Sequence, residues 1–494
     1  MHTLISLTDV TVTRGGRTLL GPLSWTLKRG DHVAVTGANG AGKTTFLTVV
    51  RGDILPDSGG KRVYDFGQGA QTSVLGIRQR IAMVSADMQD FYDLHTPHVT
   101  GRNVILAGFF DTPILYDEPT SEQEDAAARI VEVLALHELA DSQVGTMSTG
   151  QLRKILVARG LVSHPDVLLL DECLDGLDAP SRNEVLRLLN RAGEWTTLIC
   201  VAHRAGDVPE CINHAMTLDH GHLVAQGRRE DVLSALQSQA PALVACDMPA
   251  PVIDLNMEYL LRMEHVSVVR DGIRQLHSID WEILPGEQWM VVGANGAGKS
   301  TLLKVILSEV PPYADDEEGV GHIHRLGGLT MDEARPLIGV VSPDFQARYA
   351  RELGWEVTAE ETVMSGYRGS VGMLDEPTSR EKLGAAQWLE MVGLAGLGDQ
   401  RLRHMSYGQQ RRVFLARAMA PGPRLLLLDE PLSGLDSVSR AFMRERIQEV
   451  AASGTPLVLV THHADDRVPC INRILELDKG RVKFCGLAHK YVMG

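Results

Sequence analysis

Two copies of a glycine-rich pattern that ends in a lysine and a hydroxyl residue have the clearest chemistry in this sequence. The pattern G-x-x-x-x-G-K-[ST] occurs at Gly37–Thr44 and at Gly293–Ser300. Its glycines let backbone N–H groups converge on phosphates, its lysine neutralises the β- and γ-phosphates, and its hydroxyl is a ligand for Mg²⁺. The predicted ATP-binding residues of these two loops are Gly37, Asn39, Gly40, Gly42, Lys43, Thr44 and Thr45, then Gly293, Asn295, Gly296, Gly298, Lys299, Ser300 and Thr301.

Acidic pairs follow two continuous apolar runs, "VLLL" before Asp171 and "LLLL" before Asp429. A short, wholly apolar run is typical of a buried parallel strand, and an acidic pair at its end suits a metal-dependent phosphate site. Asp171 and Asp429, together with the hydroxyls of Thr44 and Ser300, are the predicted ligands of Mg²⁺. Glu172 and Glu430 are predicted to polarise the attacking water.

These motifs recur in the same order at a nearly constant spacing. The two lysines lie 256 residues apart and the two aspartates 258 apart, so the chain contains a duplicated domain. The predicted boundaries are a first domain at 1–236, a short linker rich in Ala and Pro at 237–256, and a second domain at 257–494.

Apolar stretches that alternate with helical patterns must position these residues. "DHVAVTG" and "EQWMVVG" are predicted strands that run into the glycine-rich loops, and "KTTFLTVVRG" and "KSTLLKVILSEV" are the helices that follow. This alternation predicts an α/β domain with a largely parallel sheet. Two other Asp-Glu pairs, within Tyr116–Ser121 and Leu374–Ser379, lack a buried run before them and are interpreted as surface loops or helix starts.

Composition excludes several classes of protein. The chain has 494 residues, 44% of them hydrophobic, and a formal charge of −15. No apolar run approaches the roughly 20 residues of a membrane span, and the N-terminus lacks a secretory pattern, so a cytoplasmic location is expected. The acidic balance disfavours a broad nucleic-acid surface. The six cysteines form no CxxC pair and are expected to be reduced thiols.

The complete set of motifs resembles the ATPase domain of the ATP-binding-cassette superfamily. Besides the phosphate loops and acidic pairs, each half contains an S-x-G-Q motif, a G-L-D motif and a late histidine. The resemblance covers nearly the whole chain. It implies a RecA-like core, an antiparallel β subdomain and a small helical subdomain in each half. It also implies contacts of His203 and His462 with the γ-phosphate, and places Asp178 and Asp436 in interface loops.

The resemblance further implies that two nucleotides lie between facing domains of one chain, each held by the phosphate loop of one and the S-x-G-Q motif of the other. Site one would join Lys43, Thr44, Asp171, Glu172 and His203 to Ser406, Gly408 and Gln409. Site two would join Lys299, Ser300, Asp429, Glu430 and His462 to Ser148, Gly150 and Gln151.

The chain departs from the family pattern at three places. The residue between Ser and Gly of the signature, usually Gly, is Thr149 in one half and Tyr407 in the other. The glutamines of the usual Gln loop, Gln89 and Gln346, come three residues late. Either that loop is remodelled or these glutamines do not contact the metal.

The position that usually carries an adenine-stacking aromatic holds Arg14 in the first half and Arg270 in the second. A guanidinium can stack on a base, and a solvated turn arginine is an equal alternative. Cys211 and Cys470 occupy equivalent positions and are interpreted as small core residues.

The departures resemble the ModF type of tandem ATPase, which is associated with molybdate uptake and also labelled photorepair. That resemblance implies an energising subunit that joins a separate membrane permease, peripherally at the inner face of the membrane. Two alternatives stay open: a sugar-importer type of tandem ATPase, and a non-transport ATPase acting on ribosomes or damaged DNA. The nearly uncharged linker and the absence of zinc-type cysteines disfavour the latter.

Overall fold

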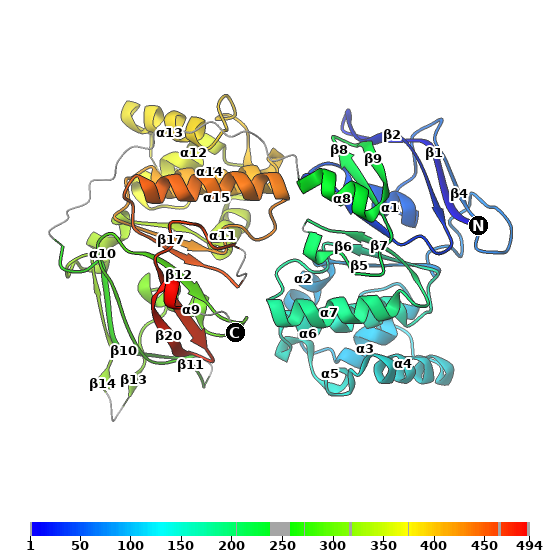
Figure 1. The fold of residues 1–494 in the computed structure, drawn as a ribbon, viewed down its shortest axis with the longest axis horizontal. Coiled ribbons are helices and arrows are strands. Elements are labelled where there is room, and N and C mark those ends of the chain that lie inside the picture. Colours follow the sequence, from blue (N-terminus) through cyan, green and yellow to red (C-terminus); the bar gives the residue numbers. More distant parts are fainter. Residues whose placement is uncertain are drawn as a thin grey trace. The chain divides into compact units, whose positions relative to one another are not determined.

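The computed structural model describes residues 2–203, 205–237, 257–270, 272–315, 319–373, 375–462 and 466–491. The chain divides into two compact units, Met1–Pro241 and Ala242–Gly494 (Figure 1). Most of the predicted linker, 238–256, lies outside the described residues. Each unit is therefore treated by itself.

A six-stranded sheet forms the core of each unit, and only its last strand pair is antiparallel. In the first unit the order is β5 (Ile81–Ser85), β6 (Val167–Asp171), β7 (Thr197–Val201), β3 (Val33–Thr36), β8 (His214–Asp219) and β9 (His222–Arg228). In the second unit it is β16 (Ile338–Val341), β17 (Leu425–Asp429), β18 (Leu457–Val460), β12 (Gln288–Val292), β19 (Arg473–Asp478) and β20 (Arg481–Leu487).

The central strands are buried on both faces, as their uninterrupted apolar runs predict. Every residue of β6, β7, β17 and β18 is buried. The parallel strands all present their carboxyl ends at one edge of the sheet, which is where open α/β sheets place their ligand sites.

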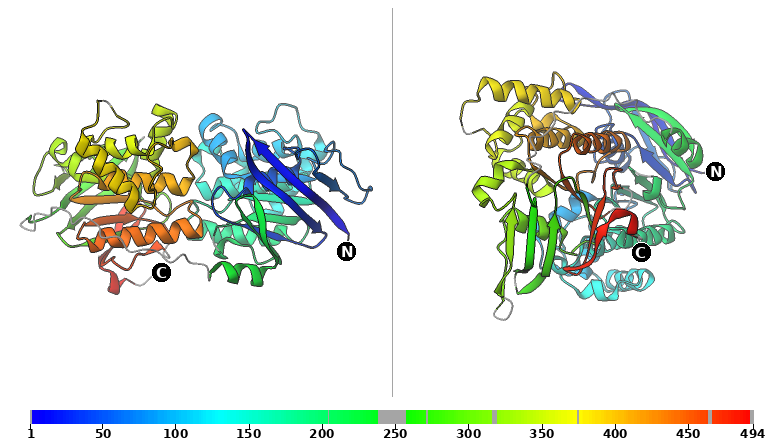
Figure 2. Two further views of the ribbon diagram at one scale, coloured as in Figure 1. Left: turned by 90° about the horizontal axis from the view of Figure 1, so that it is seen from above. Right: turned by 60° about the vertical axis from the view of Figure 1, so that its left-hand side comes forward.

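An antiparallel sheet packs beside each core. The first consists of β2 (Arg17–Lys28), β1 (Thr3–Arg14) and β4 (Lys61–Tyr64), and the second of β11 (Ile273–Ile283), β10 (Leu261–Arg270) and β15 (His322–Arg325). The second unit adds the short pair β13 (Ala314–Asp315) and β14 (Gly319–Val320). In Figure 2, β1 and β2 stand as a separate dark-blue layer at one end of the first unit.

A helical segment lies at the opposite end of each unit from this antiparallel sheet (Figure 1). In the first unit it contains α2 (Ala86–His95), α3 (Gly101–Leu106), α4 (Ser121–Leu134), α5 (His137–Asp141) and α6 (Thr149–Leu161). In the second it contains α11 (Pro343–Leu353), α12 (Ala359–Ser365), the 3₁₀ helix η5 (Gly366–Arg368), α13 (Ser379–Met391) and α14 (Tyr407–Met419). Helices α6 and α14 are buried along most of their length.

The remaining helices flank the sheets: α1 (Lys43–Arg51), α7 (Ala179–Ala192) and α8 (Arg229–Gln237), then α9 (Lys299–Ile306), α10 (Met331–Ala334) and α15 (Ser437–Ala452). Shorter 3₁₀ turns are η1 (Ala107–Phe109), η2 (Val144–Thr146), η3 (Ala205–Asp207), η4 (Arg335–Leu337), η6 (Leu402–His404) and η8 (Ala488–Lys490). Among the described helices, none combines the length and apolar character needed to cross a bilayer.

The architecture confirms the predicted α/β fold in two tandem repeats. The two other Asp-Glu pairs lie in exposed loops that lead into helices, since Thr120 caps α4 and Thr378 caps α13. The predicted core cysteines Cys211 and Cys470 are only half-buried, packed against the rim of the core. The described cysteines, Cys173, Cys200, Cys211, Cys470 and Cys485, are all free thiols.

Candidate active site

The two phosphate loops connect a core strand to the N-terminus of α1 or α9. The N-cap residues Gly42 and Gly298 have φ of 95° and 99°, a left-handed conformation that favours glycine. A Cβ on Gly42 would lie 2.7 Å from the carbonyl oxygen of Leu19. The loop therefore needs glycine there both for its turn and for its close approach to β2.

Both loop lysines are buried and fold over their own loops. The Nζ of Lys43 donates to the carbonyls of Gly37 and Ala38, at 2.9 and 3.0 Å. Lys299 makes the equivalent bonds at 2.7 and 2.9 Å. Each ammonium is thus held inside a loop of converging backbone groups at a helix N-terminus, the arrangement that binds phosphate.

The acidic pairs lie at the carboxyl ends of β6 and β17, between neighbouring strands. Asp171 is in register with Ser85 on one side and Val201 on the other. The following residues, Glu172 and Glu430, have φ of 52° and 47°. For a non-glycine residue this left-handed conformation costs on the order of 1–3 kcal/mol, and such strain concentrates at functional sites.

Each glutamate contacts the late histidine of its own unit. The Nε2 of His203 lies 2.7 Å from an oxygen of Glu172, and the Nδ1 of His462 lies 2.5 Å from an oxygen of Glu430. The histidine side chains are only 2% and 1% exposed. The γ-phosphate contact stays a prediction, and the structure adds that each histidine orients a glutamate.

Opposing effects set the charge of Glu172. Burial raises the pKa of this carboxyl, but the hydrogen bond and charge of His203 and the charge of Lys43 outweigh burial. The net pKa lies below the ordinary value. Glu172 is therefore ionised at neutral pH and able to accept a proton.

Asp429 has the properties expected of a metal ligand. Burial raises its pKa from 3.8 to about 6, and the adjacent Glu430 carboxylate adds to the rise, while a hydrogen bond from Ser300 opposes it. Its Oδ1 is buried without a hydrogen-bond partner among the described residues. A buried oxygen beside a hydroxyl and a second carboxylate fits a hard cation such as Mg²⁺.

Two carboxylates near these groups escaped the sequence analysis. Asp175 lies 4.0 Å from the Nε2 of His203, where the second unit has Ser433. The negative charge of Asp344 raises the pKa of Asp429, and Asp344 forms an ion pair with Lys304 at 2.6 Å. Aligning the two halves would have shown the first substitution, but the proximity of Asp344 depends on how α11 packs.

The signature motifs form helix N-termini with reciprocal caps. The hydroxyl of Ser148 accepts the Gln151 N–H, and the side-chain oxygen of Gln151 accepts the Ser148 N–H. Ser406 and Gln409 repeat this capping box. It satisfies two helix-end donors and leaves other backbone N–H groups of the first turn for an anion.

The signature glycines are required by packing within their own unit. A Cβ on Gly150 would lie 2.5 Å from the Cβ of Ser181, and one on Gly408 would lie 2.5 Å from the Oγ of Ser439. Ser181 and Ser439 belong to the first turns of α7 and α15, whose N-caps are Asp178 and Asp436. These aspartates therefore position the helices that support each signature motif.

Tyr407 lies along its own helix. Its hydroxyl accepts a hydrogen bond from Arg411 Nη2 at 2.5 Å, and the Arg411 guanidinium stacks 5.0 Å from the ring centre. The ring also packs against Gly434, where an added Cβ would meet it at 3.0 Å.

The shifted glutamines point into the helical segment. Gln346 is 5% exposed and donates to the side-chain oxygen of Gln410 on α14, at 3.2 Å. Gln89 is also buried, on α2. The side-chain oxygens of both glutamines are buried without a hydrogen-bond partner among the described residues, so both alternatives for the Gln loop stay predictions. Arg14 and Arg270 are exposed at the tips of their hairpins, so base stacking and solvation both stay open.

The raised pKa of Asp429 predicts that Asp429→Asn stabilises the nucleotide-free protein at neutral pH. The folded state binds the proton more tightly than the unfolded chain does, so stability is present at low pH and lost as pH rises through about 6. The difference corresponds to about 3 kcal/mol. In thermal unfolding, variant and wild type should agree near pH 4, and the variant should gain several degrees at pH 8.

Asp478→Asn is a matched control, because Asp478 also ends a core strand but is exposed. It should leave the unfolding temperature unchanged at both pH values. A lower unfolding temperature for Asp429→Asn at pH 8 would contradict this account of the buried charge.

Comparison with known proteins agrees with this geometry. The family model described as "ABC transporter" matches residues 20–175 and 276–433. The chain is 31% identical to the ABC transporter ATP-binding protein ModF of Escherichia coli, over 91% of this chain and 92% of that protein. It is 27% identical to an uncharacterized ABC transporter ATP-binding protein of Schizosaccharomyces pombe, over 93% and 95%.

A shorter relative matches about one unit. The uncharacterized ABC transporter ATP-binding protein YlmA of Bacillus subtilis is 33% identical over 45% of this chain and 83% of its own length. The two-unit architecture, the two matches to the family model and the full-length relatives lead to one conclusion: the chain belongs to the ATP-binding-cassette superfamily and is an ATP-hydrolysing ATPase with two cassettes in tandem.

Proposed function

We propose that this chain is the energising subunit of an ATP-binding-cassette transporter and that both of its cassettes are catalytic. The observation that carries the catalytic part is the duplicated glutamate–histidine pair, which each unit holds at the end of a central strand next to a phosphate loop. The transport part is supported by the similarity to the protein named ModF over nearly the whole chain.

The two proposed sites are composite. Site one joins the phosphate loop, Asp171, Glu172 and His203 to the signature that begins at Ser406, and site two makes the reciprocal combination. Support comes from the signature helices, whose capping boxes leave first-turn N–H groups suited to a phosphate.

Within each site the chain positions charges around the phosphates. The lysine and the helix N-terminus bind phosphate oxygens, and the glutamate, which has a left-handed backbone, orients the attacking water and accepts its proton. The histidine holds the glutamate through a hydrogen bond between its ring nitrogen and the carboxylate. Thr44 and Asp171, or Ser300 and Asp429, would hold Mg²⁺, which would neutralise charge on the phosphates.

The proposed partner is a separate membrane permease, a proposal supported by the likeness to relatives named as ATP-binding proteins of ABC transporters. The helical segments are the proposed contact, which would place the protein in the cytoplasm at the inner face of the membrane. Molybdate is the proposed solute through the likeness to ModF. A sugar-importer type of subunit and a non-transport ATPase on ribosomes or damaged DNA remain the alternatives.

Paired composite sites predict closure within one chain. Glu172→Gln with Glu430→Gln should trap ATP unhydrolysed, and sedimentation should then show a more compact particle of about 53.9 kDa. Lys43→Ala with Lys299→Ala is the control that should bind no ATP, because the phosphate charge loses its counter-charge, and should not compact. A stable dimer of the glutamate variant would mean that cassettes pair between chains.

The transport role predicts a change in cellular molybdate. Cells of the source organism that lack the chain should accumulate several-fold less molybdenum, measured by elemental analysis after molybdate feeding. The wild-type chain should restore accumulation and the double lysine variant should not. Unchanged molybdenum, with altered ribosome profiles or survival after DNA damage, would favour the non-transport alternative.

Unequal sites are the third expectation of this proposal, with site two the faster. In the first unit Asp175 places a second carboxylate beside His203, close to where the γ-phosphate must lie, whereas Ser433 is neutral. Cys173 replaces the more rigid Pro431 after the catalytic glutamate. Tyr407 contributes less to the difference between the sites than its size indicates, because its ring packs on Gly434.

Steady-state turnover tests the inequality. Each single variant leaves one site intact. Glu430→Gln leaves the slower site one and should remove most activity, whereas Glu172→Gln leaves the faster site two and should remove less. Adding Asp175→Ser to Glu430→Gln should raise turnover several-fold, and adding Ser433→Asp to Glu172→Gln should lower it. A tenfold change needs only about 1.4 kcal/mol. Equal losses from the two glutamate variants, or the reverse order, would contradict the expectation.

A further inference from the structure

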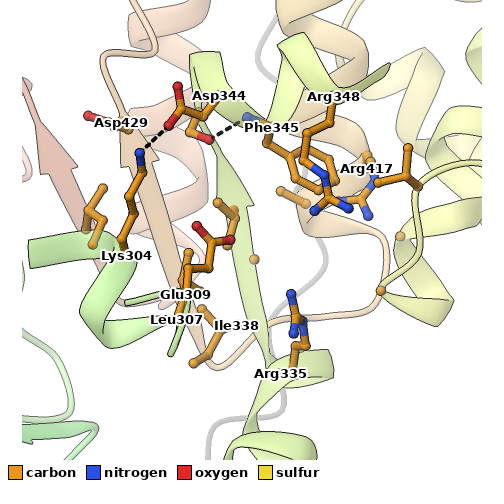
Figure 3. A pocket seen from close by; sticks show the side chains of 18 of the residues that line it. Lys304, Leu307, Glu309, Arg335, Ile338, Asp344, Phe345, Arg348, Arg417 and Asp429 are labelled. Carbon is orange, nitrogen blue, oxygen red and sulfur yellow. Dashed lines mark hydrogen bonds and ion pairs between the residues drawn. The ribbon is translucent and has the colours of Figure 1, made fainter. Parts of the chain in front are cut away.

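A pocket in the second unit opens between the core and the helical segment. Its volume is about 230 Å³, and its walls come from α9, β16 and β17 on one side and α11, η5 and α14 on the other. Figure 3 shows that the guanidinium groups of Arg335, Arg348 and Arg417 lie on one side, whereas Lys304 and Asp344 lie on the other. The pocket is therefore polarised.

Arg417 is a buried cation without a neutralising partner. It is 6% exposed and donates to the Tyr349 hydroxyl at 3.0 Å, the Ser365 hydroxyl at 3.2 Å and the Ser370 carbonyl at 2.8 Å. No carboxylate among the described residues lies within ion-pair distance of it. A buried charge that is hydrogen-bonded but not neutralised favours binding of an opposite charge.

A second cation lies close to the first. Arg348 and Arg417 both stack over the ring of Phe345, at 5.9 and 4.3 Å from its centre. Burial lowers the pKa of the Arg417 guanidinium, and the charge of Arg348 lowers it further. Two guanidiniums on one wall thus repel each other, and an anion between them would relieve that repulsion.

The nearby carboxylates offset only part of this charge. Glu352 pairs with Arg348 at 3.1 Å along α11, and Glu309 lines the pocket opposite the arginines. Asp344 is occupied by Lys304. Asp429 also lines the pocket, but among the described residues neither it nor Glu309 forms an ion pair with Arg348 or Arg417. These two guanidiniums therefore share one ion-paired carboxylate, Glu352, which leaves one positive charge of the pair without such a partner.

The first unit has different residues at two of the equivalent positions. Two residues after its glutamine it has Phe91 where the second unit has Arg348, and ten residues after its lysine it has Asp53 in place of Glu309. Asp53 forms ion pairs with Arg51 at 3.4 Å and Arg78 at 3.0 Å. Arg417 itself has a buried counterpart in Arg159, which donates to the Thr112 carbonyl at 3.0 Å. The neighbouring cation Arg348 is therefore what distinguishes the second unit.

We infer that this pocket binds a small monocarboxylate with an apolar body, its carboxylate between Arg348 and Arg417. Planar guanidiniums bind carboxylates through paired hydrogen bonds, and most ligand sites combine a few such polar groups with apolar walls. The apolar surface here is contributed by Leu303, Leu307, Ile338 and Val371. The bound molecule would tie the core to the helical segment. The inference does not depend on the transport proposal.

Fluorine NMR with 4-fluorobenzoate tests the inference on the whole chain saturated with Mg-ADP, which occupies the phosphate loops. We expect saturable binding at or below millimolar concentration, and binding of neutral 4-fluorobenzamide at least tenfold weaker. Equal binding of the two probes, or no saturable binding, would overturn the inference. Ser300 and Asp429 also line the pocket, so binding of 4-fluorobenzoate only when Mg-ADP is absent would show that the probe occupies the nucleotide site, and this result would also overturn the inference.

Arg348→Phe copies the first unit, which carries Phe91 at this position, and replaces a partly exposed side chain, so the fold should persist. It should raise the dissociation constant of 4-fluorobenzoate at least tenfold. Arg351→Gln is the matched control on an exposed position of the same helix, outside the pocket, and should leave binding unchanged. Equal effects of the two variants, or no effect of Arg348→Phe, would contradict the assigned site.

Discussion

A buried aspartate followed by a partly buried glutamate, at the end of a central strand, is the constraint on which each unit depends. Asp429 and Glu430 follow four apolar residues, so the chain brings two negative charges to the edge of its most apolar layer. Burial and mutual repulsion raise the pKa of Asp429 to about 6. Polar groups around the pair stabilise these charges. Ser300 donates a hydrogen bond to the aspartate, and His462 contacts the glutamate, whose backbone is strained.

Close packing between helices positions the signature motifs. The signature glycines have no room for a Cβ because the first turns of α7 and α15 press against them. The aspartates of the G-L-D motifs cap those helices. Glycine in the signature motif could be explained by a close approach of the backbone to a nucleotide. The packing of two helices within the unit already requires it.

Duplication has left the two units alike in framework and different in charge. The strand order, the capping boxes and the glutamate–histidine contacts are repeated. Asp175 of the first unit occupies the position equivalent to Ser433 of the second, and Phe91 the position equivalent to Arg348. Single substitutions of this kind alter electrostatics without disturbing the core, because they lie at the ends of strands and on the rims of helices.

The sequence by itself determined the α/β class, the duplication, both phosphate loops and the acidic strand ends, because glycine spacing and uninterrupted apolar runs are local signals. It also separated the pairs at the strand ends from the two decoy Asp-Glu pairs, which lie in exposed loops that lead into α4 and α13. Tertiary structure alone decided which groups meet. Gln346 turns toward Gln410, Asp344 approaches Asp429, and three arginines converge on one pocket. These contacts join residues far apart in the chain, and their geometry depends on how helices pack on the sheet, which no local pattern encodes.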